Sequence, residues 1–353
     1  MPEDLIDFCS QVLEKAGINK DEARIAAEII TSADMRGVSS HGSVYLQTFV
    51  KRIKEGGIDP KADIEILRQG PAWALLDGHG AMGQLTAYKA TNIVIEKAKS
   101  CGVSIVGVKN GMHFGAAAYY SMMIAKQDMI GISMSNADIT MAITGSSSRV
   151  IGNNPFSYAA PAGDEKPVVL DMAMSVVAGG KIKLAVDDDK NIPFGWLLNP
   201  DGEPTSKPSD FFDGGALLPF ADHKGYGLAL MVEILAGVIT GNPITKDIVS
   251  WAKDLSHPCP EGFAFIAVNI GNFRPIEEYK ARMDVLIRQM RSSPRAKGVG
   301  RIYLPGELEY EKEERARTSG IVLASPILKS LQNLATDLGL SDKLNSMFKE
   351  VNN

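Results

Sequence analysis

Cysteine is scarce in this chain, and there is no excess of basic charge. The three cysteines among 353 residues, Cys9, Cys101 and Cys259, are far apart and form no CxxC pair. This spacing argues against a disulfide framework and a thiolate metal site, and it fits a reducing, cytoplasmic compartment. The formal net charge of −5 offers no basic surface of the kind that nucleic-acid binding requires.

Long apolar runs and common catalytic signatures are also missing. The longest apolar stretch, residues 226–240, contains Glu233 and is too short to span a bilayer, so no membrane partner is expected. No charged segment precedes an apolar run at the amino terminus, so no signal peptide is expected. The five histidines show no HxH or HExxH spacing, so no catalytic metal is expected. The absence of a P-loop and of GxSxG argues against NTPases and serine hydrolases.

What is present is a helical pattern at both ends of the chain with a mixed pattern between them. Terminal helices are predicted over residues 4–16, from Asn19 to Gly37, from His41 to Gly56 and over 326–338. Strands are predicted over 74–77, 103–108, 130–134, 168–170, 263–268 and 301–304. Further helices are predicted over 84–99, 116–127, 225–240 and 276–290, and a loop over 191–212. These patterns predict a mixed α/β centre and terminal helices that could form one discontinuous domain.

Residues 36–45, RGVSSHGSVY, place a histidine at the start of a predicted helix. Ser40 is expected to cap this helix, and His41 to lie in its first turn. The positive end of a helix disfavours an imidazolium, so the pKa of His41 is expected to be lowered. A neutral imidazole near pH 7 can exchange a proton with a substrate, although the same ring could simply pack beside the cap.

A GxGxxG run at residues 78–83 follows a predicted strand and precedes a predicted helix, which is the context of a dinucleotide-binding turn. Such a site also needs an acidic residue at the end of the second strand. That strand ends at Lys109 and Asn110 instead. A tight turn is therefore the favoured interpretation, with a dinucleotide site as the alternative.

Other polar groups lie where strands end or helices begin. His113 follows a predicted strand and could be an acid or base, a cap or a packed ring. Asn154 and Asp171 suit the hydroxyls and phosphates of a dinucleotide, although turn and capping chemistry explain them equally well. His223 and Lys224 place cations at a helix start, which opposes the helix dipole and suggests a bound anion. A surface lysine remains the alternative.

Seven ordered segments resemble the type 2 malate/L-lactate dehydrogenase family, which includes ureidoglycolate, sulfolactate and diketogulonate-type oxidoreductases. The segments are RGVSSHG from residue 36, HFGAAAYY from 113, IGNNPF from 151, LDMAMSVVAGGKI from 170, IPFGW from 192, LLPFADHKGYGLA from 217 and YLPGE from 303. Together they extend over nearly the whole chain.

The resemblance implies an α/β (mixed α+β) fold without a Rossmann domain. A largely antiparallel mixed sheet is expected to carry an NAD(P)-binding and catalytic domain over residues 71–308. A discontinuous helical domain is expected over 1–70 with 309–353. The resemblance also implies a homodimer, and it makes the GxGxxG run a turn.

The resemblance implies hydride transfer between NAD or NADP and a small 2-hydroxy or 2-oxo acid, such as malate, lactate, sulfolactate, ureidoglycolate or a sugar acid. His41 is implied as the proton donor and acceptor, assisted by Ser40, and His113 as a residue of the substrate pocket. The segments matched to the cofactor contain Phe114, Gly115, Asn154, Pro155, Asp171, Met172, Ala173, Lys181, His223, Lys224, Pro305, Gly306 and Glu307.

Tyr45 is the main departure from the family pattern SHGxxR, because it stands where members carry an arginine. A cation is expected to hold the carboxylate of an anionic substrate. Arg52, further along the same predicted helix, is the candidate, so Arg52 and Tyr45 are the expected substrate-binding residues. Two alternatives stay open: a cyclic imine reductase of the piperideine-2-carboxylate type, and a catalytically silent ligand-binding member.

Overall fold

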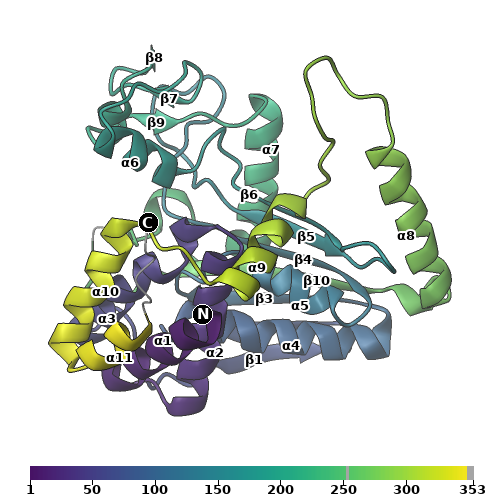
Figure 1. The fold of residues 1–353 in the computed structure, drawn as a ribbon, viewed down its shortest axis with the longest axis horizontal. Coiled ribbons are helices and arrows are strands. Elements are labelled where there is room, and N and C mark those ends of the chain that lie inside the picture. Colours follow the sequence, from purple (N-terminus) through teal and green to yellow (C-terminus); the bar gives the residue numbers. More distant parts are fainter. Residues whose placement is uncertain (252–253, 348–353) are drawn as a thin grey trace.

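A twisted sheet of seven strands forms the centre of the molecule, in the order β1-β2-β3-β10-β4-β5-β6 (Figure 1). The computed structural model describes residues 1–251 and 254–347. All neighbouring strands are antiparallel except β2 and β3, which are parallel. The strands are β1 (Glu65–Gly70), β2 (Trp73–Asp77), β3 (Val103–Gly111), β4 (Met129–Ser135), β5 (Phe156–Ala160), β6 (Val168–Met172) and β10 (Glu261–Asn269). The predicted mixed, largely antiparallel sheet is confirmed.

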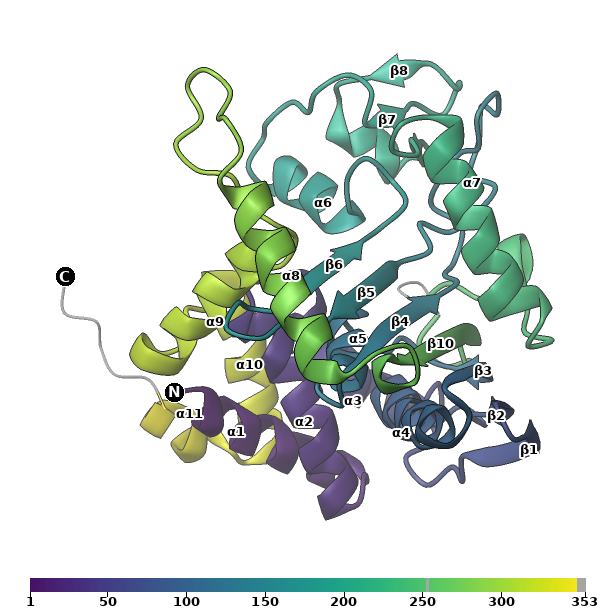
Figure 2. The same ribbon diagram turned by 90° about the vertical axis from the view of Figure 1, so that its right-hand side faces the viewer.

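Strand β10 shows why both faces of this sheet are buried. Phe263 and Phe265 belong to one core, whereas Ala264 and Ile266 between them pack in a second core. Successive side chains of a strand point to opposite faces, so an uninterrupted apolar run supplies both cores. Helices α4 (Gly83–Cys101) and α5 (Ala118–Ala125) pack on the sheet, and Figure 2 shows the strands following one another from β6 to β1.

Helices from both ends of the chain lie side by side, as the purple and yellow ribbons show in Figure 1. They are α1 (Pro2–Ala16), α2 (Lys20–Met35), α3 (Leu46–Glu55), α9 (Glu307–Ser319), α10 (Ser325–Leu338) and α11 (Ser341–Met347). Contacts join α1 to α10 and α11, and α2 to α9. Gly17 ends α1 in the left-handed conformation, and the Asn19 side chain caps α2 through the Glu22 amide.

The GxGxxG run forms the turn between β2 and α4. Each of the three positions requires glycine. Gly80 has φ +75°, and a Cβ on Gly78 or Gly83 would collide with the backbone of residues 110–113. The parallel strands β2 and β3 flank α4, so this is a single strand-helix-strand unit. None of these three glycines lines the large cavity described below. The favoured interpretation as a turn agrees with this geometry.

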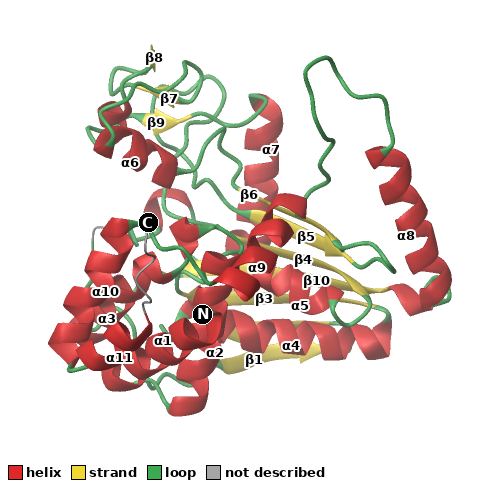
Figure 3. Cartoon of the chain, in the orientation of Figure 1, coloured by secondary structure: helices red, strands yellow, loops and turns green. Residues whose placement is uncertain are grey.

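A second group of elements packs at the end of the sheet opposite the terminal helices. It contains α6 (Gly179–Asp187), α7 (His223–Val232) and the short strands β7 (Leu197–Leu198), β8 (Pro204–Thr205) and β9 (Ala216–Leu217). Figure 3 shows that long loops connect these elements. The helix predicted over 225–240 begins as α7 and continues as a π-helical segment, Glu233–Val238.

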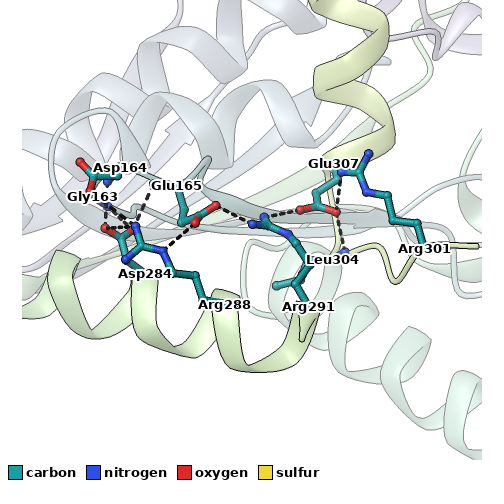
Figure 4. Close-up of polar contacts among 9 residues, drawn as sticks. All are labelled: Gly163, Asp164, Glu165, Asp284, Arg288, Arg291, Arg301, Leu304 and Glu307. Atoms are coloured by element: carbon teal, nitrogen blue, oxygen red, sulfur yellow. Dashed lines mark hydrogen bonds and ion pairs between the residues drawn. The ribbon is translucent and has the colours of Figure 1, made fainter. Parts of the chain in front are cut away.

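Helix α8 (Ile276–Arg291) is held at one side of the molecule mainly by polar contacts (Figure 4). The carboxylate of Asp284 accepts the backbone N–H groups of residues 163, 164 and 165 at 2.9–3.2 Å. Arg288 and Arg291 each donate to Glu165 at 2.9 Å, and Arg291 also donates to Glu307 at the start of α9. Within the described residues, no helix has the length and apolarity needed to cross a membrane.

Candidate active site

A cavity of about 680 Å³ lies where the terminal helices meet the sheet. Helix α2, the start of α5, the end of β6, the start of α6 and the turn before α9 contribute to its wall. The sequence-predicted site residues on this wall are Ser40, His41, His113, Phe114, Gly115, Pro155, Asp171, Met172, Ala173, Lys181, Pro305 and Gly306. Segments separated by more than 250 positions therefore meet at one cavity.

His41 lies on a 3₁₀ turn, Ser39–His41, and not in the first turn of an α-helix. A second 3₁₀ turn follows, and α3 begins only at Leu46, so the predicted helix start was wrong. The buried Asp34 of α2 fixes this region because its carboxylate accepts the Ser43 N–H at 2.8 Å. A Cβ on Gly42 would collide with that carboxylate, so glycine is needed for the close approach.

The surroundings of His41 favour a neutral imidazole. Its Nδ1 lies 2.9 Å from Ser40 Oγ, and its ring stacks on His113 with centroids 5.6 Å apart. Burial lowers the pKa of His41 to about 4, because the protein excludes the water that would solvate an imidazolium. The predicted direction is thus correct, but desolvation is the cause in place of a helix end.

His113 is enclosed by aromatic rings. Its ring stacks on Trp251 at 4.8 Å between centroids, and Tyr45 meets it edge-on at 5.3 Å. Burial, followed by the charges of His41 and Arg52, lowers the pKa of His113 to about 3. Its buried Nδ1 has no hydrogen-bond partner within the described residues, and His113 itself is one of the residues that line the cavity.

Arg52 is not among the residues that line the cavity, and its expected role in holding the substrate stays a prediction. Its fully buried guanidinium donates to the carbonyl oxygens of Trp251, Asp254 and His257 at 2.7–3.3 Å and lies over the Trp251 ring at 4.8 Å. The reason is geometric: α3 turns this position toward the loop before β10. Arg52 therefore holds that loop, and Trp251 with it, against the site.

Asp171 provides a carboxylate on the opposite wall. One of its oxygens accepts the Ala118 N–H at the start of α5 at 3.0 Å. Desolvation raises the pKa of Asp171 to about 6, although the Ala118 N–H and the charge of Arg36 act in the other direction. Next to it, Met172 and Ala173 complete the end of β6.

Four residues expected at the cofactor do not lie on this wall. The Asn154 side chain is buried and bonds to Ala229 and Glu233, which fixes the start of β5. Glu307 pairs with arginines of α8 and the following loop. His223 and Lys224 are exposed at the start of α7. The cofactor role of these residues stays a prediction.

The cavity wall also contains polar residues that sequence reasoning missed, among them Arg36, Asn153, Glu261, Tyr303 and Glu309. Arg36 belongs to RGVSSHG and follows the end of α2, where it is buried, but the sequence pattern carried no signal of this position. It pairs with Glu313 at 2.9 Å and lies over the Tyr310 ring. Glu261 could have been singled out from the sequence, because its carboxylate begins an otherwise apolar strand.

One charged group, Lys181, lies on the cavity wall near the Ser40–His41 pair. Lys181 lies in the first turn of α6 and lines the cavity, and a Cβ on Gly180 would lie 3.5 Å from Ser40 Cβ. This places the start of α6 beside the Ser40–His41 pair, where a cation can hold an anionic group.

Among the described residues, no group of three His, Cys, Asp or Glu side chains could hold a metal ion.

Comparison with known proteins agrees with this fold. A family model described as malate/L-lactate dehydrogenase matches residues 1–332. The malate dehydrogenase of Pyrococcus abyssi is 39% identical, over 96% of this chain and 94% of that protein. The ureidoglycolate dehydrogenase (NAD(+)) of Escherichia coli strain K12 is 32% identical, over 93% of each. The solved structure of sulfolactate dehydrogenase from Methanocaldococcus jannaschii has a TM-score of 0.90 and 35% identity over 98% of both chains.

These matches extend over nearly the whole chain and include both halves of the cavity wall. They agree with the ordered motifs from RGVSSHG to YLPGE and with the largely antiparallel sheet. Such agreement of sequence and fold supports an oxidoreductase that acts on 2-hydroxy acids, and the chain belongs to the malate/L-lactate dehydrogenase family.

Proposed function

We propose that the protein is an NAD- or NADP-dependent enzyme that interconverts small 2-hydroxy and 2-oxo acids. The observation that carries this proposal is the Ser40–His41 pair on the cavity wall, with His41 desolvated and its Nδ1 2.9 Å from the serine hydroxyl. A histidine held in this way is suited to exchange a proton with a substrate oxygen.

The residues of the cavity fit a nicotinamide dinucleotide. Asp171 offers a carboxylate to hydroxyl groups, and Gly115 and Gly306, with φ +86° and +93°, leave backbone open to a ligand. Pro155, Met172, Ala173 and Pro305 provide apolar wall for a ring. When bound, the cofactor supplies or accepts the hydride. Lys181 balances an anionic group, either a cofactor phosphate or the substrate carboxylate.

The two directions of the reaction need different protonation states of His41. In oxidation, the neutral imidazole takes the proton of the substrate hydroxyl. In reduction, the imidazolium returns a proton to the carbonyl oxygen. A substrate carboxylate bound beside the ring favours the imidazolium and raises its pKa from the value near 4 of the open site. Ser40 keeps the ring oriented in both directions.

The test combines cofactor binding with a His41 variant. We expect NADH or NADPH to bind in a fluorescence titration, and one or more of lactate, malate, sulfolactate and ureidoglycolate to be oxidised. His41→Ala is expected to lower kcat by at least about a hundredfold, the scale of a lost acid or base, with cofactor affinity nearly unchanged. The control is His79→Ala, which alters an exposed histidine away from the cavity. A protein that binds neither NADH nor NADPH, or a His41 variant with full activity, would contradict the proposal.

We also propose that the protein works as a cytoplasmic homodimer. Apolar side chains are exposed along α7 and the π-helical segment, including Leu228, Ile234, Val238 and Ile239. An exposed apolar patch of this kind is typical of a protein-protein interface. Light scattering on the purified protein should give twice the mass of the chain, and a monomer would contradict this part.

A further inference from the structure

Glu261 is a buried carboxylic acid on the cavity wall that the mechanism above does not use. It begins β10 and is only 4% exposed. Its register partner is Gly111 of β3, two residues before His113, and a β-bulge follows between Glu261 and Phe263. Strand pairing therefore places this carboxyl group at the end of the cavity where the His41–His113 stack lies.

No cation pairs with Glu261 within the described residues. Its Oε1 has a weak contact with Cys259 Sγ at 3.9 Å, and the guanidinium of Arg52 is occupied by backbone carbonyls. Burial, followed by the nearby charge of Asp138, raises the pKa of Glu261 well above its usual range, and Arg52 offsets this only in part. A buried carboxyl without a counter-ion is costly to the fold.

The surroundings of Glu261 are those of a site for a positive charge. The rings of Tyr45, His113 and Trp251 contact one another with centroids 4.8–5.6 Å apart. Burial, followed by the charges of Glu261 and Asp138, raises the pKa of Tyr45. The Trp251 ring already stacks on His113 and carries the Arg52 guanidinium over it, so the Glu261 carboxylate is the group that would attract a further cation and disfavour a second carboxylate.

We propose that Glu261 is the counter-ion for a positively charged nitrogen on the substrate, so that this chain acts on 2-oxo and 2-hydroxy acids with a cationic tail. The inference rests on the proposed function and adds its substrate class. The acid group of the substrate lies toward His41 and Lys181, and the cationic tail lies toward Glu261, all of which line the cavity. Binding the cation ionises Glu261, which supplies the charge that is missing in the empty site.

Three 2-oxo acids of similar length test this assignment, because they differ in the charge of the tail. They are 2-oxo-5-guanidinopentanoate with a positive tail, 2-oxohexanoate with a neutral tail and 2-oxoadipate with a negative tail. We expect kcat/KM with the bound cofactor to be highest for the positive tail, by at least about tenfold over the neutral one, and lowest for the negative tail.

Glu261→Gln keeps the shape of the side chain and removes its charge. The variant is expected to lose the preference for the positive tail while it keeps activity on 2-oxohexanoate within about threefold. The matched control is Glu309→Gln, which removes another carboxylate of the cavity wall and should leave the order of the three acids unchanged. A second readout uses the wild type alone: calorimetry in two buffers should detect more proton release when the guanidino acid binds than when 2-oxohexanoate binds, because proton uptake by His41 is common to both acids.

Equal kcat/KM for the positive and neutral tails, a preference for 2-oxoadipate, or turnover of pyruvate with none of the three probes would overturn the assignment. So would a Glu261→Gln variant that keeps the wild-type order. These results differ from a failure of the proposed function, in which no 2-oxo acid, pyruvate included, is reduced with NADH or NADPH.

Discussion

Arg52 shows that a residue's type does not reveal its surroundings. An arginine on the same predicted helix as His41 is a natural candidate for a substrate carboxylate. In the structure, the guanidinium is fully buried, and each of its hydrogen bonds to the described residues ends on a backbone carbonyl. Spacing along a sequence does not reveal which neighbour a long side chain reaches, because that neighbour lies about 200 residues away.

Removal of Arg52 should therefore destabilise the protein. Arg52→Ala removes the donor from three carbonyl groups, of which that of Trp251 is buried, and opens a cavity beneath Trp251. We expect the free energy of unfolding, measured with urea, to fall by at least about 3 kcal/mol. The control is Lys51→Ala, at the exposed residue next to Arg52. This change should alter the free energy of unfolding by less than about 0.5 kcal/mol. Equal stability of the two variants would show that these carbonyls find other partners.

Asp34 should make stability depend on pH in an unusual direction. Burial raises its pKa from 3.8 to about 6, although the Ser43 N–H opposes this. A carboxyl whose folded-state pKa is raised destabilises the fold when ionised, so its cost is absent below about pH 4 and complete above about pH 6. The difference corresponds to about 3 kcal/mol at pH 7.

Asp34→Asn removes this titration and keeps an oxygen that can accept the Ser43 N–H. The stability of the variant relative to wild type should therefore rise as the pH is raised from 4 to 6.5. Urea unfolding at half-unit pH intervals measures this difference, which cancels the contributions of other groups. A difference that does not vary with pH would mean that Asp34 ionises in the folded protein as it does in the unfolded chain.

At the scale of elements, the sequence predicted well wherever local rules and packing agree. Helix α1 ends at Gly17, α2 begins after Asn19 and α10 ends at Gly339, all as their caps predicted. Strand β1, which pairs with β2, was not predicted. Its first five residues are exposed, so the sequence shows no buried face that would indicate a strand. The strand predicted over 301–304 was wrong, since this segment pairs with no strand and its Leu304 amide bonds to Glu307.

The tether of α8 gives a prediction at this scale. Asp284→Ala removes the acceptor for three backbone N–H groups of the turn between β5 and β6. We expect amide hydrogens of residues 276–291 to exchange faster while those of β4 and β10 keep their protection, because α8 is attached mainly through this contact and the Glu165 pairs. Arg282→Ala, on the exposed side of the same helix, is the control. Unchanged exchange in α8 would contradict the tether.

Acid should weaken the same attachment. Burial tends to raise the pKa of Asp284, but the N–H groups of residues 163–165 outweigh it and keep the pKa below its usual range. A carboxyl with a lowered folded-state pKa contributes stability at neutral pH, and this contribution is lost as the pH falls through the lowered value. Protonation therefore acts on α8 in the same direction as the Asp284 substitution.

For the whole molecule, the motifs predicted the family and the fold, whereas the division into domains stays a prediction. One cluster of buried side chains includes residues of α1, α2, α3 and α10 together with residues of β2, β3 and β10. The terminal helices and the sheet thus share a core. Hydrophobic periodicity shows which face of each element is buried, but it does not show against which other element that face packs.

Strand β10 couples this core to the second one, and the coupling can be measured. Trp251 lies in the first core, and Trp196 packs against the second. Because adjacent residues of β10 belong to different cores, we expect both to unfold together. Tryptophan fluorescence of Trp196→Phe and Trp251→Phe should follow far-UV circular dichroism with the same midpoint within each variant. Midpoints that separate would show that the second core unfolds on its own.

The contribution of both chain ends to the cavity has a consequence for synthesis. His41 is translated long before Tyr303, Leu304 and Gly306, which line the same cavity. Helix α1 also waits for its contacts with α10 and α11. A nascent chain on the ribosome therefore has no complete cavity until the segment up to Gly306 has emerged.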